Sequence, residues 1–176
     1  MDALKDAIRG IRDFPKPGIV FRDITPVLAH PELFRQAVER LSQPYYDSGV
    51  QLVAGTEARG FILAPAVALQ LGAGFVPIRK KGKLPCETFQ ATYELEYGTD
   101  ALEMHRDAIQ PGARVLMVDD LLATGGTMKA CCDMVEQAGG AIVGCVFLVE
   151  LSFLGGRDKL AGYDLHVLVD FPSEDG

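Results

Sequence analysis

Residues 115–127, VLMVDDLLATGGT, decide how the chain is organised. The four apolar residues 115–118 are typical of a buried strand in a parallel sheet. Two adjacent acids, Asp119 and Asp120, stand at the carboxyl end of this strand, and a glycine-rich turn follows them. We expect a helix to begin at about Thr127, because threonine is a good N-cap. The stretch therefore predicts a strand, a tight turn and a helix in immediate succession.

The turn itself favours a phosphate ligand. Gly125 and Gly126 would let the backbone approach a ligand closely, and the helix start offers free N–H groups and the positive end of a helix dipole. The two acids would repel the same phosphate, so they must bind another part of the ligand. A vicinal diol suits them, because carboxylates only accept hydrogen bonds and hydroxyls can donate them. A phosphate on the turn and a diol on the acids describe a ribose 5-phosphate.

Rival phosphate-binding motifs fit this stretch less well. It contains no G-x-G-x-x-G, and Lys129 is out of place for G-x-x-x-x-G-K-[ST]. An apolar strand that ends in Asp could be a Walker-B strand, but the partner motif is missing. The remaining alternative is a structural connection in which glycines serve packing and acids serve solubility. The letters ATGGT that follow the acids weigh against that alternative.

The composition is that of one ordinary globular domain. The chain has 176 residues, of which 48% are apolar and 23% charged, so it can bury a real core. The formal net charge of -7 argues against a general nucleic-acid surface or an anionic membrane surface as partner. The longest apolar stretches, such as 141–149, are too short to span a bilayer, and the acidic start is not a secretory signal. We expect residues 1–176 to form one cytoplasmic domain.

Cysteine and histidine spacing predicts neither a disulfide nor a protein-built metal site. The four cysteines include no C-x-x-C pair, and Cys131 and Cys132 are adjacent on one expected helix. Reduced and mostly buried thiols are therefore the favoured interpretation. The three histidines are scattered and show no metal-binding spacing.

Apolar runs and helical patterns alternate along most of the chain. The expected strands cover residues 51–54, 75–78, 115–118, 141–149 and 165–171. We expect one helix to begin at Pro31. A second should follow the loop 55–60 and end near Leu71, with Pro65 in its first turn, and a third should run from about Thr127 to Ala138. This alternation predicts an α/β domain with a mainly parallel central sheet of about five strands and flanking helices. Ligand-binding loops should gather at the carboxyl ends of those strands.

The N-terminal segment departs from this alternation. Apolar residues recur at helical spacing over 4–11, behind Asp2 as a plausible N-cap, and residues 14–18 with their two prolines break the pattern. Ile19–Phe21 is a short apolar piece, followed at once by Arg22 and Asp23. Without further information, this piece is a core-anchoring loop with a candidate surface ion pair.

Two further loops place cations just past an expected strand. Arg59, in the loop 55–60, could pair with Glu57 or bind an anion through its fixed fork of donors. The only dense basic cluster follows the strand 75–78 and consists of Arg79, Lys80, Lys81 and Lys83. A cationic surface turn would explain this cluster. Its place beside two other anion-binding loops favours a polyanion site.

Residues 84–98 interrupt the alternation with a long polar excursion. Long insertions in compact α/β domains tend to be lids or binding loops. Within it, Tyr93, Leu95 and Tyr97 alternate with glutamates, which is the pattern of a half-exposed strand.

The stretch VLMVDDLLATGGT closely resembles the 5-phosphoribosyl-1-pyrophosphate (PRPP) signature of type I phosphoribosyltransferases. Its form DDLLATGGT is similar to that of the members that act on adenine, and the resemblance extends from about Phe14 to about Leu160. The resemblance implies that Asp119 and Asp120 bind the ribose hydroxyls. It also implies that the 5-phosphate lies on Ala123, Thr124, Gly125, Gly126 and Thr127.

Four other motifs resemble the same family. FPKPGIVFRDITPVL (14–28) is similar to its adenine-binding hood, which implies that Phe21 stacks on the purine, that the backbone at Val20 reads the purine edge and that Arg22 lies alongside. TEARGF (56–61) resembles the loop that cradles pyrophosphate, and IRKKGKLP (78–85) resembles the basic motif. YELEYG (93–98) resembles the mobile catalytic loop, whose glutamate matches Glu96, with Tyr97 as a substrate-binding neighbour.

The resemblance implies that the chain joins adenine to PRPP, giving AMP and pyrophosphate, with an N-terminal hood (1–35) and a PRPP-binding core (50–170). Such a displacement at the anomeric carbon needs a positive clamp on the leaving pyrophosphate and negative charge near the cationic sugar. The clamp would consist of Arg59, Arg79, Lys80, Lys83 and Mg²⁺ held by the ligand. Glu96, on a closing loop, would manage the purine proton and is, with Arg59, the expected catalytic residue.

The resemblance also implies a homodimer, in which Arg79 and Lys80 reach the pyrophosphate of the neighbouring subunit. Two alternatives remain open. One is a phosphoribosyltransferase for an oxopurine or for orotate, although oxopurine enzymes typically carry Asp where this chain has Ala123. The other is a PRPP-sensing regulator without catalysis, which usually needs a DNA-binding segment or a basic face, and neither is visible.

Overall fold

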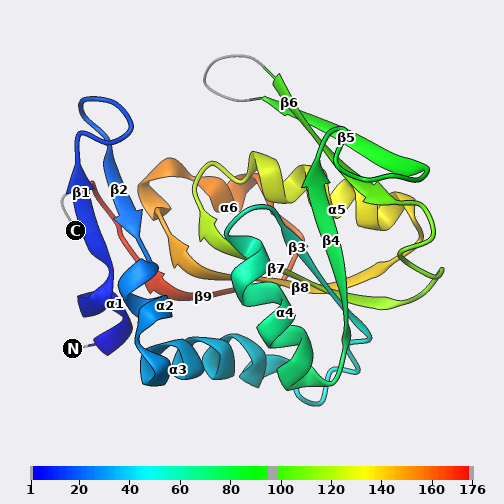
Figure 1. Ribbon diagram of the computed structural model, residues 1–176, viewed down its shortest axis with the longest axis horizontal. Coiled ribbons are helices and arrows are strands. Elements are labelled where there is room, and N and C mark those ends of the chain that lie inside the picture. Colours follow the sequence, from blue (N-terminus) through cyan, green and yellow to red (C-terminus); the bar gives the residue numbers. More distant parts are fainter. Residues whose placement is uncertain (1, 95–98, 175–176) are drawn as a thin grey trace.

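The computed structural model describes residues 2–94 and 99–174 and places them around one seven-stranded sheet (Figure 1). The strand order is β5-β6-β4-β3-β7-β8-β9. The strands are β3 (Leu52–Thr56), β4 (Gly74–Lys80), β5 (Thr88–Glu94), β6 (Thr99–His105), β7 (Arg114–Leu122), β8 (Ala141–Glu150) and β9 (Leu165–Asp170). Five of them, from β4 to β9 in this order, run parallel, which confirms the expected α/β class with a mainly parallel sheet.

The antiparallel edge of the sheet was not expected. Strand β6 pairs antiparallel with the end of β4, and β5 pairs antiparallel with β6 along its whole length. Seven residues of the excursion 84–98, Thr88–Glu94, therefore form a regular strand, and the expected number of about five strands was too low by β5 and β6. The alternation around Tyr93 indicated a strand but not the partner with which it pairs. Residues 95–98, which include Glu96 and Tyr97, lie outside the described residues.

Helices cover both faces of the sheet (Figure 1). They are α1 (Ala3–Ala7), α2 (Thr25–Ala29), α3 (Pro31–Ser42), α4 (Gly60–Leu71), α5 (Gly126–Gln137) and α6 (Gly156–Lys159), with 3₁₀ turns at Gln43–Tyr45 and Ser152–Leu154. Helix α3 opens at Pro31 as expected. Pro65 lies inside α4, beyond the first turn, so one N–H of the usual helical ladder is missing there. No helix within 2–94 and 99–174 has the length and apolar character needed to span a bilayer.

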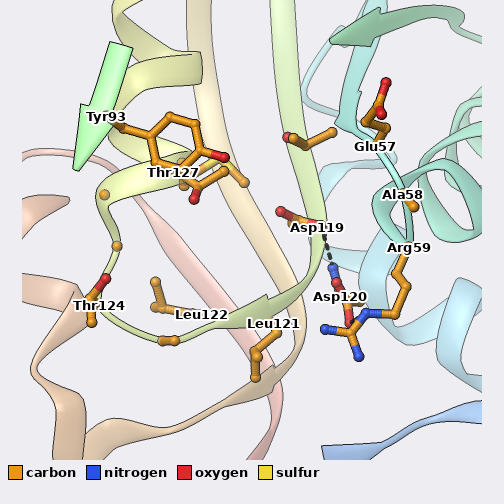
Figure 2. A pocket seen from close by; sticks show the side chains of 15 residues that line it. Glu57, Ala58, Arg59, Tyr93, Asp119, Asp120, Leu121, Leu122, Thr124 and Thr127 are labelled. Atoms are coloured by element: carbon orange, nitrogen blue, oxygen red, sulfur yellow. Dashed lines mark hydrogen bonds and ion pairs between the residues drawn. The ribbon is translucent and has the colours of Figure 1, made fainter. Parts of the chain in front are cut away.

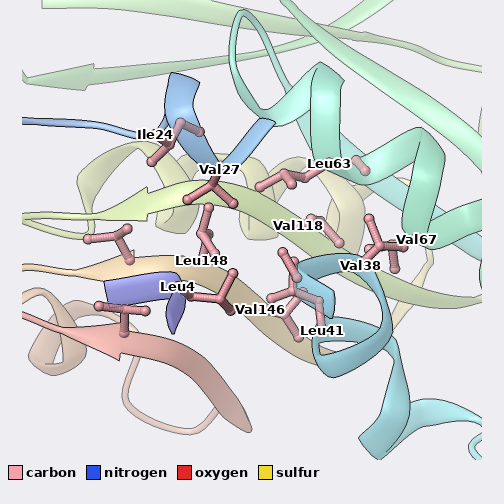
Figure 3. Packing of buried hydrophobic residues seen from close by; sticks show 14 of the residues in the cluster. Leu4, Ile24, Val27, Val38, Leu41, Leu63, Val67, Val118, Val146 and Leu148 are labelled. Carbon is pink, nitrogen blue, oxygen red and sulfur yellow. The ribbon is translucent and has the colours of Figure 1, made fainter. Parts of the chain in front are cut away.

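The apolar run at 115–118 is buried because each face of β7 has its own core. Leu116 and Val118 pack into the cluster beneath α1 to α4, part of which Figure 3 shows together with Leu4 and Val27. Val115 belongs to the second cluster, in which α5 contributes Met128, Cys131, Cys132, Met134 and Val135. Side chains alternate between the two faces of a strand, so a strand covered on both faces is apolar throughout. The expected apolar face of α5 is confirmed.

The N-terminal segment, residues 2–29, differs from its sequence prediction. Asp2 caps α1 as expected, accepting from the backbone N–H of Leu4 at 3.2 Å, but the helix ends at Ala7. Strands β1 (Arg9–Arg12) and β2 (Val20–Asp23) then form a separate antiparallel pair, in which Ile11 lies opposite Phe21. Cross-strand pairing therefore overrides the helical spacing of Ile11, and the expected loop at 19–21 becomes a strand.

The last strand and the residues after it hold the N-terminal segment in place. The Lys5 ammonium donates to the Asp170 carbonyl at 2.9 Å. The guanidinium of Arg22 lies 3.9 Å from the centre of the Phe171 ring and donates to the Glu174 carbonyl at 2.6 Å. Asp23, the candidate partner of Arg22, is buried and pairs with Arg9 at 2.5 Å.

The four cysteines are free, as their spacing predicted. Cys131, Cys132 and Cys145 are buried, and Cys86 is exposed. The sulfurs of Cys132 and Cys145 are 3.8 Å apart, within hydrogen-bond distance, so the two thiols link α5 to β8 without a disulfide. Burial raises the pKa of the Cys131 thiol above its ordinary range.

Candidate active site

A cavity of about 310 Å³ opens where the carboxyl ends of β3 and β7 meet (Figure 2). Parallel strands end at the same edge of a sheet, so their following loops lie side by side. One wall is the loop that joins β3 to α4, and the other is the end of β7 with the turn before α5. The lining residues are Thr56, Glu57, Ala58, Arg59, Tyr93 and all ten residues from Asp119 to Met128.

The turn Ala123–Thr127, called here the phosphate turn, is built from backbone. Gly125 has φ +77° and precedes α5, which begins at Gly126, so the expected N-cap role of Thr127 is wrong. A left-handed backbone at this point favours glycine, whereas threonine would be strained. The turn therefore places the start of α5, with its free backbone N–H groups, at the cavity.

A second glycine supports this turn from behind, and sequence reasoning missed it. A Cβ at Gly125 would lie 2.4 Å from the carbonyl oxygen of Gly156. A Cβ at Gly156 would lie 2.2 Å from the carbonyl oxygen of Ala123. The two backbones touch, so both positions require glycine. Gly155-Gly156 was visible as a pair in the sequence, but its partner lies 31 residues away along the chain and no local pattern identifies it.

Asp119 and Asp120 lie within β7, which continues to Leu122, and not after its end as expected. Successive side chains of a strand point to opposite faces, so the two carboxylates line the cavity from different directions. Asp120 is buried, with 5% of its surface exposed, whereas Asp119 is half-buried. The Oδ1 atom of Asp119 accepts from the backbone N–H of Asp120 at 2.9 Å.

The two acids share one electrostatic environment. Burial and the neighbouring charge of Asp120 raise the pKa of Asp119 well above its ordinary value. Burial likewise raises the pKa of Asp120, although the charge of Arg59 opposes that increase. A cationic or hydroxyl-rich ligand would relieve both effects, because it supplies the donors and positive charge that this pair lacks.

Arg59 connects the acids with the N-terminal segment. Its Nε lies 2.9 Å from Oδ2 of Asp120, and Figure 2 shows the two side chains pointing toward one another. The alternative ion pair with Glu57 is therefore wrong. The guanidinium also lies 5.1 Å from the centre of the Phe21 ring, whose edge contacts Phe14 at a centroid distance of 5.2 Å. A cation over an aromatic face is a favourable arrangement.

Glu57 gathers the basic residues that follow β4. Its carboxylate accepts from Nε of Arg79 and from the backbone N–H of Lys80, each at 3.1 Å, and it pairs with the Lys83 ammonium. Burial alone would raise the pKa of Glu57, but these three hydrogen bonds outweigh it and lower the pKa. Arg79 and Lys83 thus both pair with an acid of their own chain, and their expected binding of pyrophosphate stays a prediction.

Lys80 is held by a different acid, near a tyrosine that sequence reasoning did not assign to the site. The Lys80 ammonium lies 3.2 Å from Oδ2 of Asp100, and the same oxygen accepts from the Tyr93 hydroxyl at 3.3 Å. Burial and the Asp100 charge raise the pKa of Tyr93 to about 12. Tyr93 lies beside Thr127 in Figure 2, so it closes the wall of the cavity next to the phosphate turn.

Residues 25–167 match the family model described as a phosphoribosyl transferase domain. An adenine phosphoribosyltransferase of Thermobifida fusca is 57% identical, over 92% of this chain and 92% of its own. The crystal structure of adenine phosphoribosyltransferase from Rhodothermus marinus is 55% identical, superposes with a TM-score of 0.92 and covers 97% of both chains. A Saccharomyces cerevisiae enzyme of the same name, complexed with adenine and an iminoaltritol bisphosphate, is 41% identical, with a TM-score of 0.89 over 94% of this chain and 96% of its own.

The chain belongs to the phosphoribosyltransferase family. The expected membership and the expected fold are therefore confirmed. In this phosphoribosyltransferase the structure brings Arg59, Asp119, Asp120 and the phosphate turn into one cavity. Arg79 and Lys83 pair with Glu57, which lines this cavity, and Lys80 pairs with Asp100.

The residues expected to hold the purine are not part of this cavity lining. Phe21 reaches it through Arg59. Val20 lines a separate hollow of about 240 Å³ with Asp13, Gly18 and others of the β1–β2 connection. Arg22 lies against Phe171. Glu96 and Tyr97 fall outside the described residues, so their roles stay predictions from the family resemblance.

Proposed function

We propose that this phosphoribosyltransferase transfers the 5-phosphoribosyl group of PRPP to adenine, forming AMP and pyrophosphate in purine salvage. One observation carries the proposal: a glycine-containing turn and a buried aspartate paired with a half-buried arginine line one cavity, in a chain whose near full-length relatives are named for this activity. The expected function agrees with those names. An oxopurine enzyme is disfavoured by Ala123.

The 5-phosphate would bind the phosphate turn, and the ribose diol would bind Asp119 and Asp120. In this arrangement the acids accept hydrogen bonds from the two hydroxyls. Positive charge develops on the sugar as the bond to pyrophosphate breaks. Two carboxylates already in place and partly desolvated stabilise that charge without having to reorganise, which lowers the barrier.

Pyrophosphate would leave against Arg59, whose Asp120 partner fixes the direction of its guanidinium. Arg79, Lys80 and Lys83 would extend the positive clamp. We propose that Arg79 and Lys80 act on the neighbouring subunit of a homodimer, as the family resemblance implies. The outer side of α4 supports an interface, because Ile62 and Leu69 expose 42% and 83% of their surface there.

Adenine would stack on Phe21, with the backbone at Val20 reading its edge and with residues 1–35 as the hood over the core 50–170. The position of Phe21 next to Arg59 supports this proposal, because the purine must meet the sugar beside that arginine. Arg22 would act indirectly, by fixing β2 to Phe171. Glu96 would receive or supply the purine proton. Its segment joins β5 to β6, which pair as far as Glu94 and Thr99.

We propose that Mg²⁺ reaches the site bound to PRPP. Within 2–94 and 99–174, no group of three or more histidine, cysteine or acidic side chains could hold a metal ion. Of the three acids that line the cavity, Asp120 pairs with Arg59, Glu57 accepts from three donors, and Asp119 is assigned to the ribose diol. When bound, the ion would neutralise pyrophosphate charge, and the chain would supply Arg59 on the same group. Free cysteines and net negative charge support a cytoplasmic location without a nucleic-acid or membrane partner.

A turnover assay tests the proposal directly. The purified protein is given PRPP and Mg²⁺ with adenine, hypoxanthine, guanine or orotate in parallel, and nucleotide formation is measured. We expect turnover on adenine alone, because a site built for a 6-amino edge leaves buried groups unpaired against a 6-oxo edge. Comparable turnover on hypoxanthine would reject the base assignment, and PRPP binding without any turnover would favour the regulator.

The proposed role of Glu96 has its own test. Glu96→Gln should lower turnover much more than it lowers PRPP affinity, because its interaction is assigned to the transition state. Full turnover by this variant would remove Glu96 from the mechanism while leaving the substrate assignment intact.

A further inference from the structure

Helix α6 (Gly156–Lys159) is fixed on the back of the phosphate turn. Its first residue, Gly156, is buried and touches the backbone of Ala123 and Gly125 so closely that neither glycine has room for a Cβ. At the base of the helix, the Arg157 guanidinium makes a two-pronged ion pair with buried Glu150, at 2.8 and 2.7 Å. The short helix therefore keeps a defined position relative to the turn.

This position brings Lys159 to the start of α5. The Lys159 ammonium lies 3.7 Å from the point where a Cβ at Gly126 would stand. It shares a hollow of about 210 Å³ with Tyr93, Gly126 and Lys129, among others. Two of these, Tyr93 and Gly126, also line the main cavity. The ammonium thus stands at the rim of the phosphate turn.

Lys159 differs from its basic neighbours in having no acidic partner among the described residues. Within 2–94 and 99–174, the cations that line or flank the two hollows have acidic partners, whereas Lys159 has none. The paired cations are Arg59 with Asp120, Arg79 and Lys83 with Glu57, Lys80 with Asp100, Lys129 with Asp133 and Arg157 with Glu150. An uncompensated ammonium next to a turn of free N–H groups raises the local positive potential.

We propose that Lys159 is a further PRPP-binding residue, which neutralises the 5-phosphate from outside the phosphate turn. The inference rests on the proposed function. The backbone N–H groups of the turn bind phosphate oxygens directly but carry only partial charges. A phosphate monoester carries up to two negative charges. Lys159 can bind it without first breaking an ion pair, whereas Lys129 in the same hollow is paired with Asp133.

The effect should be moderate, because Lys159 is exposed. A full charge about 5–6 Å from a phosphate in a largely aqueous setting changes affinity by about fivefold. The same exposure makes the effect depend on salt. Exposed charges are screened over about 10 Å at 0.1 M salt and over about 3 Å at 1 M, so the advantage of Lys159 should shrink at high salt.

The test compares two lysines of the same hollow. Lys159→Gln, Lys159→Arg and, as matched control, the double variant Lys129→Gln/Asp133→Asn are titrated by calorimetry with ribose 5-phosphate and with pyrophosphate. We expect Lys159→Gln to bind ribose 5-phosphate about fivefold more weakly, with pyrophosphate affinity unchanged. Lys159→Arg should restore the affinity, and the double variant should leave it unchanged, because removing both members of the Lys129–Asp133 pair keeps the net charge of the hollow.

Three results would overturn the proposal. They are unchanged ribose 5-phosphate affinity in Lys159→Gln, an equal loss for pyrophosphate, or a loss that Lys159→Arg does not rescue. In turnover assays, Lys159→Gln should raise KM for PRPP and leave kcat unchanged. Absence of turnover on adenine in the unmodified protein would reject the proposed function, and the ribose 5-phosphate titration would still decide the role of Lys159.

Discussion

Two regions at the cavity are assigned to anion binding, and one is built from backbone whereas the other is built from charged side chains. The phosphate turn, Ala123–Thr127, is backbone fixed by the contact of Gly125 with Gly156. The second region, residues 79–83 after β4, which we call the basic segment, consists of side chains. The three cations assigned to pyrophosphate form ion pairs with acids of the same chain: Arg79 and Lys83 with Glu57, and Lys80 with Asp100.

The difference concerns what a ligand must displace. The turn has its N–H groups in place before phosphate arrives and loses only water on binding. The basic segment has to exchange a resident carboxylate for pyrophosphate, so part of the new attraction offsets an old one. Changes of backbone should therefore affect the first region most, and changes of charge should affect the second.

The largest expected effect is that of Gly125→Ala. A side chain there meets the Gly156 carbonyl at 2.4 Å and occupies a backbone with φ +77°. The left-handed conformation alone costs about 1–2 kcal/mol, and the collision must move the turn as well. We expect kcat/KM for PRPP to fall by more than about a hundredfold, since a turn displaced by about 1 Å already costs that much.

Gly112→Ala is the matched control for this prediction. Its φ is +80°, but no atom lies within 4 Å of the added Cβ. It should lower thermal stability as its strained backbone predicts and leave kcat/KM nearly unchanged. Equal losses in the two variants would mean that strain, and not the contact with Gly156, determines the shape of the turn.

Asp120→Asn should have the next largest effect. The substitution keeps the shape but removes the charge that pairs with Arg59 at 2.9 Å and that is assigned to the ribose diol. A hydrogen bond to a charged group contributes about 1.5–3 kcal/mol, so PRPP affinity should fall about ten- to a hundredfold. Calorimetry measures this change, with Glu39→Gln, from the exposed pair with Arg35 on α3, as control. Unchanged affinity would contradict the diol assignment.

Glu57→Gln should act in the opposite direction on pyrophosphate. Glutamine still accepts from the Lys80 N–H but no longer competes as an anion for Arg79 and Lys83. Those cations are partly exposed, so we expect pyrophosphate to inhibit about threefold more strongly. Ribose 5-phosphate affinity should not change. Weaker inhibition would show that Glu57 positions the cations more than it competes for them.

The smallest expected effect is a dependence of stability and binding on pH. The pKa of Glu57 is lowered in the fold, so its ionised form stabilises the protein above the ordinary value of 4.5, and this stability is lost as the pH falls through the lowered pKa. The pKa values of Asp119 and Asp120 are raised, so their protonation begins above the ordinary value of 3.8. PRPP affinity should therefore decline with acid before stability does. Simultaneous decline in affinity titrations and thermal melts would contradict this order.

Local patterns predicted the turn and missed the contacts that fix it. The apolar run 115–118, two acids and the glycines are neighbours in sequence, so one stretch indicated strand, turn and ligand class. The contact with Gly156 and the pairing of β5 with β6 join distant segments, which no periodicity records. Arg59 shows the same limit. Its nearest acid in sequence, Glu57, was the obvious partner, but the parallel pairing of β3 with β7 brings Asp120 closer.

The attachment of the N-terminal segment to Phe171 also determines the order in which parts of the chain can fold during synthesis. Leu4 is fully buried in a cluster that includes Val169 and Phe171, and Lys5 and Arg22 both contact Phe171. During synthesis the first residues emerge from the ribosome long before β9 does. The site on which they dock does not exist until β9 joins the sheet. The phosphate turn, which lies earlier in the sequence, can therefore form on the nascent chain before the purine-binding side does.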